Sequence, residues 1–428
     1  MDIVKKCQLI ITTMKDNIFI LVLVLFISLS SCSSNQDNHK SNPKVIDVAG
    51  SIGIGRVVNL SEIADSIEYI PLETNEESLV GTPGSGLFYE SGLVYLLEAK
   101  VGSDALKVFN KNGAFVRQIS RCGRGPQEYE SISYLQIESK TGNLLVQSYS
   151  NKIVEYSSEG KFIRNVELKN KNITGLCKIP ENNYLFKVDV KKEDNYSVIG
   201  IDSTSGINLL VEYPETEKKL LRELSRSYAF NYPKIYKFRD SVRLINGTSE
   251  YVLNIDKDLQ IDTAFVINYG KYKINNKYVK YRAGSHSPYI FLYNRVFESS
   301  DYLFLQFHLG SLAHKQREML QGGVEGAKGN KYFVPISTSI FNKKTGVFTF
   351  ADQPAYNQIG FKDDLGGGPA IWPSYISEDD YMVSYINAID FINHAETGNC
   401  SEKFRQIASE LKDTENPVLV LVKLKKQE

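Results

Sequence analysis

Short runs of alternating apolar and polar residues, separated by tight turns, recur along most of this chain. The run at 108–117 aligns without a gap with the run at 155–164, at a constant offset of 47 residues (155 minus 108). Each run reads as a strand, a hairpin turn and a second strand, with Gly113 and Gly160 supplying the positive φ of equivalent turns. A repeat of about 45–50 residues that holds several short strands is the period of a β-propeller blade.

Weaker copies of the same turn follow at 201–206, 255–259 and 341–346. The longer gap before the last copy predicts an insertion at 311–330, which we expect to be helical over 311–321 and a loop over 322–329. The five turns predict five blades, and apolar strands at 381–386 and 417–424 predict a sixth.

The sixth predicted blade is interrupted by residues 402–411, whose apolar residues recur at helical spacing. Two segments, 45–48 and 67–70, have no blade of their own, and we expect both to pair with terminal strands and close the ring. The chain is therefore predicted to be all-β, a six-bladed β-propeller with a short C-terminal helical insertion in its last blade.

The N-terminal region has a different pattern. An apolar run of 12 residues at 18–29 follows Lys15, and it is shorter than the roughly 20 residues that span a bilayer. The run ends in Leu-Ser-Ser-Cys, which resembles a bacterial lipobox with Cys32 as the acylated residue. We therefore expect a lipoprotein signal peptide at 1–31, with 1–13 an over-long start, a disordered lipidated tether at 32–42, and the propeller at 43–428. The alternative is an ordinary signal peptide with an incidental cysteine.

Composition narrows the choice of partners. The chain has 50 Lys and Arg against 50 Asp and Glu, so no basic excess exists to hold a nucleic acid. Outside the leader the cysteines are Cys122, Cys177 and Cys400, whose spacing fits neither a disulfide framework nor a zinc site. We expect them to be small buried hydrophobes, and we expect no cofactor.

The loop at 123–129, Gly-Arg-Gly-Pro-Gln-Glu-Tyr, is the sharpest local motif. Arg121 and Arg124 are candidates to bind an anion at the mouth of the propeller, together with Glu128 and Tyr129, because arginine recognises planar carboxylates. The alternative is a structural connector between blades, in which Glu128 caps neighbouring backbone groups.

Other candidates for chemistry are scattered. Trp372 could stack on a sugar ring or belong to the core, and Asp363 and Asp364 could hold Ca²⁺ or belong to a solvated loop. His286, in a loop before a predicted strand, is the candidate general base, although a surface histidine without a role is the alternative. No Gly-x-Ser-x-Gly nucleophile motif is present in the sequence.

Three passages resemble a known family: Tyr-Ile-Pro-Leu-Glu-Thr at 69–74, the loop at 123–129, and Asn-Pro-Val-Leu-Val-Leu at 416–421. They are similar to the six-bladed β-propeller lipoproteins of Bacteroides-type bacteria, known as a domain of unknown function, and to NHL- and TolB-like propellers. The resemblance spans 43–428 and is weakest over 214–335. It implies a propeller at the cell envelope, and most NHL-type propellers are binding scaffolds.

These observations favour a non-catalytic binding or scaffold module for a glycan, a peptide or a partner protein. We expect it to be held at the membrane by a lipid anchor, in the outer membrane, with the side it faces left open. The alternative is a glycan-active hydrolase or lyase that uses His286, Arg124 or loop carboxylates in the propeller funnel. Charged side chains that converge in the funnel would keep the enzyme alternative open, whereas an apolar plug would end it.

Overall fold

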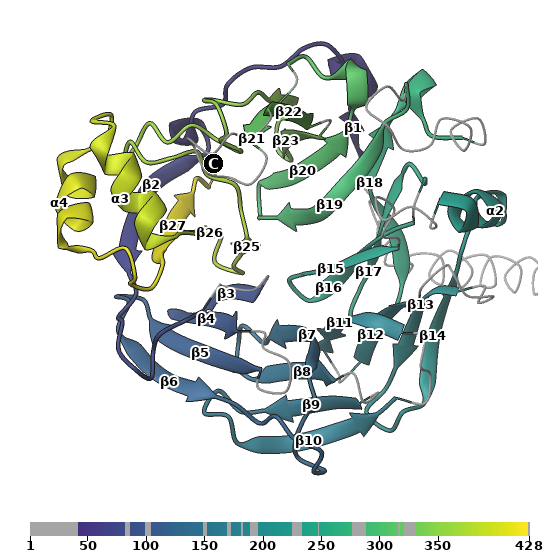
Figure 1. Cartoon of the computed structure of the whole chain (residues 1–428). Coiled ribbons are helices and arrows are strands. Elements are labelled where there is room, and N and C mark those ends of the chain that lie inside the picture. The colour runs from purple at the N-terminus through teal and green to yellow at the C-terminus, as the bar shows by residue number, and fades with distance from the viewer. Residues whose placement is uncertain are drawn as a thin grey trace, which may run out of the picture. The chain divides into compact units, whose positions relative to one another are not determined.

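Six antiparallel sheets are arranged as blades around a common axis in the computed structural model (Figure 1). The model describes residues 42–81, 86–98, 104–148, 152–168, 173–180, 183–188, 196–224, 233–246, 248–275, 288–315, 317–320, 331–334 and 336–426. The first strand of each blade contacts the first strand of the next, from β3 through β7, β11, β15, β19 and β25 and back to β3. These six inner strands form a closed ring, so the predicted six-bladed propeller is confirmed.

Each blade has four strands in order from the axis outwards. Blade 1 holds β3 (Gly86–Glu90), β4 (Leu93–Glu98), β5 (Ala105–Asn110) and β6 (Phe115–Ile119); blade 2 holds β7 (Ile132–Ile137), β8 (Leu144–Ser148), β9 (Lys152–Tyr156) and β10 (Phe162–Glu167); blade 3 holds β11 (Ile173–Ile179), β12 (Asn183–Val188), β13 (Tyr196–Ile201) and β14 (Ile207–Glu212). Blade 4 holds β15 (Lys234–Phe238), β16 (Ser241–Ile245), β17 (Tyr251–Ile255) and β18 (Ile261–Asn268); blade 5 holds β19 (Phe291–Glu298), β20 (Tyr302–His308), β23 (Ile336–Asn342) and β24 (Phe348–Ala351); blade 6 holds β25 (Tyr375–Ile376), β26 (Tyr381–Ile386), β27 (Val418–Leu424) and β2 (Ala64–Pro71).

The hairpin repeat read from the sequence joins the two outer strands of a blade. Gly113 and Gly160 have φ values of 86° and 79° and lie in the β5–β6 and β9–β10 turns. The three weaker copies join the outer strands of blades 3, 4 and 5. The repeat therefore marked the turns correctly, because a left-handed residue is needed at each of them.

Residues 44–71, which we call the N-terminal strap, run along the outer edges of three blades (Figure 1). β2 pairs antiparallel with β27, as Ile67 opposite Val422, so the closing role predicted for 67–70 is confirmed. β1 (Lys44–Asp47) instead adds a parallel fifth strand to β18, so the prediction that 45–48 pairs with a terminal strand is wrong. Its apolar residue Ile46 is fully buried between blades 4 and 5, and that burial selects this edge.

The insertion in blade 5 also differs from its prediction. A 3-10 turn at Gly310–Leu312 is followed by β21 (Arg317–Leu320), which pairs antiparallel with β22 (Lys331–Val334). The helix expected over 311–321 is therefore wrong. Pairing with a second strand, with Arg317 opposite Val334 and Leu320 opposite Lys331, outweighs the local helical spacing, and local periodicity cannot show such a partner.

Two helices lie between β26 and β27 of the last blade. α4 (Glu402–Glu410) confirms the helix predicted at 402–411, and its N-cap Ser401 accepts a hydrogen bond from the backbone N–H of Phe404 at 3.2 Å. α3 (Ala388–Glu396), which was not predicted, stacks Phe391 on Phe404 with ring centroids 3.8 Å apart. The other helices within the described residues are α2 (Glu215–Leu224) and 3-10 turns at Ala49–Ser51, Leu60–Glu62 and Gly270–Tyr272.

None of the helices in the described ranges is long and apolar enough to cross a bilayer.

Candidate functional site

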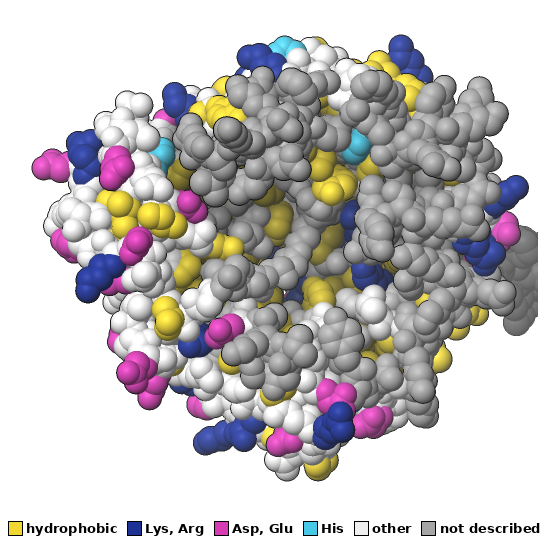
Figure 2. Space-filling model, viewed as in Figure 1, with side chains coloured by type: hydrophobic (Ala, Val, Ile, Leu, Met, Phe, Trp, Pro, Cys, Tyr) yellow, Lys and Arg dark blue, Asp and Glu magenta, His cyan; other side chains and the backbone are white. Residues whose placement is uncertain are grey.

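The centre of the ring is hollow, and apolar and basic side chains appear on its wall (Figure 2). The inner strands all run towards the same end of this channel. A glutamate lies at or within two residues of that end in four blades, and we call these residues the glutamate ring: Glu90, Glu138, Glu298 and Glu378.

Each member of the glutamate ring is held by a base or a phenol, and these contacts mostly join different blades. Glu138 of blade 2 pairs with Lys178 of blade 3 at 2.8 Å. Glu378 of blade 6 pairs with Lys237 of blade 4 at 3.3 Å, so this ion pair links the two strands on either side of β19. The ring therefore supplies both hydrogen-bond acceptors and donors at one end of the channel.

Glu90 is nearly fully buried, at 2% exposure, and lies between blades 1 and 6. The Tyr375 hydroxyl donates to its Oε1 at 2.5 Å, and the Tyr375 ring packs edge-on against Phe88 with centroids 5.4 Å apart. Burial raises the pKa of the Glu90 carboxyl to about 7, and the charge of Glu378 adds to this rise while the Tyr375 hydrogen bond opposes it. At neutral pH a large share of Glu90 therefore holds its proton, which is unusual for a glutamate.

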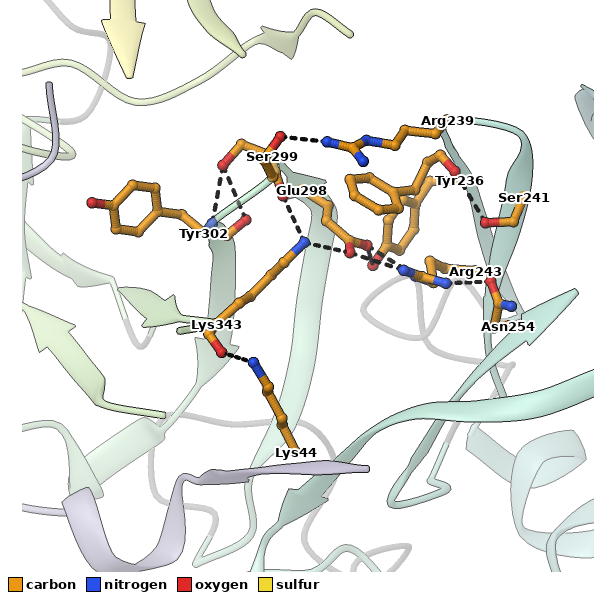
Figure 3. Close-up of polar contacts among 12 residues, drawn as sticks. Lys44, Tyr236, Arg239, Ser241, Arg243, Asn254, Glu298, Ser299, Tyr302 and Lys343 are labelled. Carbon is orange, nitrogen blue, oxygen red and sulfur yellow. Dashed lines mark hydrogen bonds and ion pairs between the residues drawn. The ribbon is translucent and has the colours of Figure 1, made fainter. Parts of the chain in front are cut away.

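Glu298 is the most heavily paired member of the ring. Its carboxylate lies between the Lys343 ammonium at 2.9 Å and the Arg243 guanidinium at 3.1 Å (Figure 3). The Tyr236 hydroxyl donates to the same carboxylate at 3.0 Å. Since the Glu298 side chain is only 1% exposed, this cluster joins blades 4 and 5 in a dry environment and has a structural role.

The predicted anion-binding loop lies against the outer strands of blade 2. The carbonyl oxygens of Gly125 and Gln127 accept hydrogen bonds from Lys152 and Tyr156 of β9. Nε of Arg121 donates to the carbonyl of Gly160 at 3.2 Å, whereas Arg124 is 90% exposed and 3.3 Å from Glu130. Both arginines are therefore exposed to solvent, and their role in anion binding stays a prediction.

The other two residues of that loop hold its conformation. Glu128 accepts a hydrogen bond from the backbone N–H of Gly125 at 2.8 Å, and a Cβ at Gly123 would lie 2.0 Å from Glu128 Oε2. Tyr129 is 2% exposed and donates to the carbonyl of Asp104 at 3.2 Å.

Trp372 packs in the core between blades 5 and 6, with its ring 5.6 Å from Phe361 and 6.2 Å from Phe304. Tyr375, three residues further along the chain, packs against Phe88 of blade 1. Cys32 and His286 lie outside the described residues.

The two candidate metal ligands are engaged in different contacts. Asp363 accepts hydrogen bonds from the backbone N–H groups of Leu365, Gly366 and Gly368 and from the Tyr69 hydroxyl. Asp364 accepts from the backbone N–H and the hydroxyl of Ser61, at 2.9 and 2.5 Å, and so fastens the strap. Within the part of the chain that the structure describes, no three His, Cys, Asp or Glu side chains gather as metal ligands.

Sequence reasoning missed the glutamate ring, although a signal was present. Aligning the inner strands of the blades places a glutamate at or just after the end of four of them, in phase with the turn repeat. It also missed a pair formed by His314 and Asp352, whose Nδ1 and Oδ2 are 3.0 Å apart beside a cavity of about 20 Å³. That cavity has room for a single water molecule and is too small for a glycan or a peptide.

Comparison with known proteins agrees with the fold. A solved structure of a Bacteroides fragilis protein described as exported is 18% identical and superposes with a TM-score of 0.63, covering 89% of this chain and 100% of that one. A member of the DUF4221 family from Bacteroides vulgatus is 11% identical with a TM-score of 0.48, covering 85% and 97%. No curated protein sequence matches significantly. The model of a domain of unknown function, DUF4934, matches residues 43–423, nearly the whole propeller, and the chain therefore belongs to that family.

Proposed function

We propose that this propeller is an exported, lipid-anchored binding module that holds a glycan in its central channel without turning it over. The observation that carries the proposal is the glutamate ring, where carboxylates, ammonium groups and a phenol from several blades meet at one end of the channel. Sugar hydroxyls both donate and accept hydrogen bonds, so they match a site that alternates acids with bases beside aromatic rings.

Lys237 and Glu378 are the members best placed to meet a ligand. Their side chains are 22% and 31% exposed, whereas Glu90 and Glu298 are almost completely buried. Phe88 and Tyr375 provide aromatic surface next to this pair. The ligand is therefore expected to contact the exposed ion pair and to leave the buried glutamates in their structural contacts.

A second candidate function, glycan hydrolysis or elimination, is favoured by one observation. A carboxyl with a pKa of about 7 can donate a proton at neutral pH, as a general acid must, and Glu378 lies close enough to raise that pKa further. The burial of Glu90 and its hydrogen bond to Tyr375 argue against direct contact with a substrate, and for this reason we place binding first.

Substitution of the exposed ion pair tests the binding proposal. We expect Lys237→Met and Glu378→Gln each to weaken glycan binding by about tenfold or more, because each removes a charge-assisted hydrogen bond worth roughly 1.5–3 kcal/mol. A glycan array identifies the ligand, and calorimetry on the purified full-length chain measures its affinity. Lys344→Met, in an exposed turn of blade 5, is the matched control.

The same samples separate the two candidate functions. After prolonged incubation, chromatography of the bound glycan should show no shorter or unsaturated product. Product formation that Glu90→Gln abolishes would establish the enzyme instead. Binding that neither ion-pair variant weakens would remove the glutamate ring as the site.

The anchor is tested separately. We expect Cys32→Ala to move the protein from the detergent phase to the aqueous phase in a phase-partitioning assay, because acyl chains on this one residue would provide the membrane affinity. A Ser33→Ala variant is the control. Unchanged partitioning of the Cys32 variant would mean that the anchor lies elsewhere.

A further inference from the structure

Two lysines from neighbouring blades lie at the end of the channel opposite the glutamate ring. Lys234 is the first residue of the inner strand β15 of blade 4. Lys187, near the end of β12 in blade 3, lies opposite Thr174 at the start of the inner strand β11. β15 contacts both β11 and β12, so the two lysines belong to adjoining walls of the channel.

The backbone of blade 3 is shaped so that Lys187 lies over its inner strand. β11 has a bulge between Thr174 and Leu176, and Gly175 within it has a φ of 67°. A Cβ at Gly175 would lie 3.4–3.5 Å from Cγ, Cδ and Cε of Lys187, which means that the lysine stem follows the backbone of the strand nearest the axis. The stem of Lys187 therefore reaches from the second strand across to β11, the inner strand of the blade.

The two lysines are close enough to influence each other. The pKa of Lys234 is lowered to about 8, first by burial and then by the positive charge of Lys187. The side chains of Lys187 and Lys234 are partly exposed, and Thr174, opposite Lys187 in the sheet, is exposed. Two neighbouring ammonium groups and a hydroxyl suit an anionic group placed between them.

We propose that Lys187 and Lys234, with Thr174, form an anion subsite at this end of the channel, and that it binds the carboxylate or sulfate of an acidic glycan. This inference rests on the proposed function, since it assigns the charge of the glycan that the channel holds. The glutamate ring at the opposite end would then contact neutral hydroxyl groups of the same ligand.

The inference predicts a pH dependence with a definite sign. Lys234 binds an anion only when protonated, so affinity for an acidic glycan falls as pH rises from 7 to 9 through its pKa of about 8. An ordinary lysine, with a pKa near 10.5, would show no such fall in this range. Arginine stays protonated throughout, so Lys234→Arg should keep the affinity and lose the pH dependence.

The experiment has two arms. In the first, inorganic sulfate is titrated into the full-length chain while NMR follows the pKa of the Lys234 ammonium, which should rise in the native protein and rise less in Lys187→Met. In the second, calorimetry compares an oligogalacturonate, a sulfated galactan oligosaccharide, a neutral galactan oligosaccharide and a polyglutamate peptide. We expect Lys187→Met and Lys234→Met each to weaken binding of the acidic glycans by about 10- to 100-fold and to leave the neutral one unchanged.

The outcomes separate this inference from the proposed function. If the neutral glycan binds as well as the acidic ones and sulfate leaves the pKa of Lys234 unchanged, the anion subsite is wrong and channel binding stands. If no glycan binds but sulfate raises that pKa in the native protein only, the subsite stands and the glycan proposal fails. A preference for polyglutamate would overturn the assignment to glycans. Lys344→Met serves again as the matched control, and thermal unfolding confirms that each variant is folded.

Discussion

Glu298→Ala is expected to destabilise the propeller by about 3–5 kcal/mol, because removal of one partner from a buried charged cluster leaves the remaining charges without compensation. Two cations depend on this one carboxylate, since the side chains of Arg243 and Lys343 are only 11% and 12% exposed. A loss of this size is a large part of the stability of an ordinary folded domain. Urea unfolding of the variant and the native protein at pH 7 measures the difference in the free energy of unfolding.

The loss should become smaller at high pH. Burial lowers the pKa of Lys343, so once Glu298 is removed this lysine can release its proton, whereas Arg243 cannot. Asp240→Ala is the control, since Asp240 forms an exposed ion pair with Lys140 at 3.5 Å and such pairs contribute at most about 1 kcal/mol. If both variants lose similarly little stability, water reaches the Glu298 cluster and our description of it as dry is wrong.

Glu90→Gln is expected to stabilise the protein by up to roughly 3 kcal/mol at pH 8 and to leave its stability near pH 4 unchanged. The pKa of Glu90 is about 7 in the folded chain against an ordinary 4.5, and each pKa unit corresponds to about 1.4 kcal/mol. Below pH 4.5 the carboxyl is protonated in both the folded and the unfolded chain. Between about 4.5 and 7 it ionises first in the unfolded chain, so stability falls as pH rises.

Glutamine keeps the size of the side chain and an acceptor for the Tyr375 hydroxyl, and it cannot ionise. Free energies of unfolding measured every half pH unit should therefore converge for the two proteins at low pH and separate towards pH 8. Tyr375→Phe gives the complementary test, because it removes the hydrogen bond that favours the charged form and should steepen the fall. Parallel curves for native protein and Glu90→Gln would show that Glu90 ionises normally.

The blade repeat was readable from the sequence because hairpin turns impose a local requirement. Gly113 and Gly160 must adopt a positive φ, and the strands beside them alternate apolar and polar residues, so the signal lies within about ten residues. β1 and the β21–β22 hairpin were mispredicted because their form depends on which edge lies alongside them. The residues of a strand do not by themselves show which neighbouring edge the strand will pair with.

The candidate site was harder to predict for a related reason. Glu90 and Tyr375 are 285 residues apart in the chain, and Lys237 and Glu378 are 141 apart. These contacts form only because the closed ring of blades brings the inner strands together. The composition of the loop at 123–129 suggested a binding site. Its glycines and Glu128 instead fit a connector that packs on β9 and β10. Local composition therefore indicated where the backbone needs a tight turn, but it could not indicate which residues meet at the channel.

The N-terminal strap also constrains the order in which the protein can be completed. β2 lies near the start of the chain, and its partner β27 lies near the end. Ile67 therefore cannot pair until Val422, 355 residues later (422 minus 67), has been synthesised. Chain synthesis proceeds from the N-terminus, and contacts of such long sequence separation form slowly. A ribosome that stalls before the last blade would therefore release a chain in which β2 is unpaired and the apolar faces of blades 1 and 5 are uncovered. Such a chain is a substrate for chaperones and proteases rather than a partly working propeller.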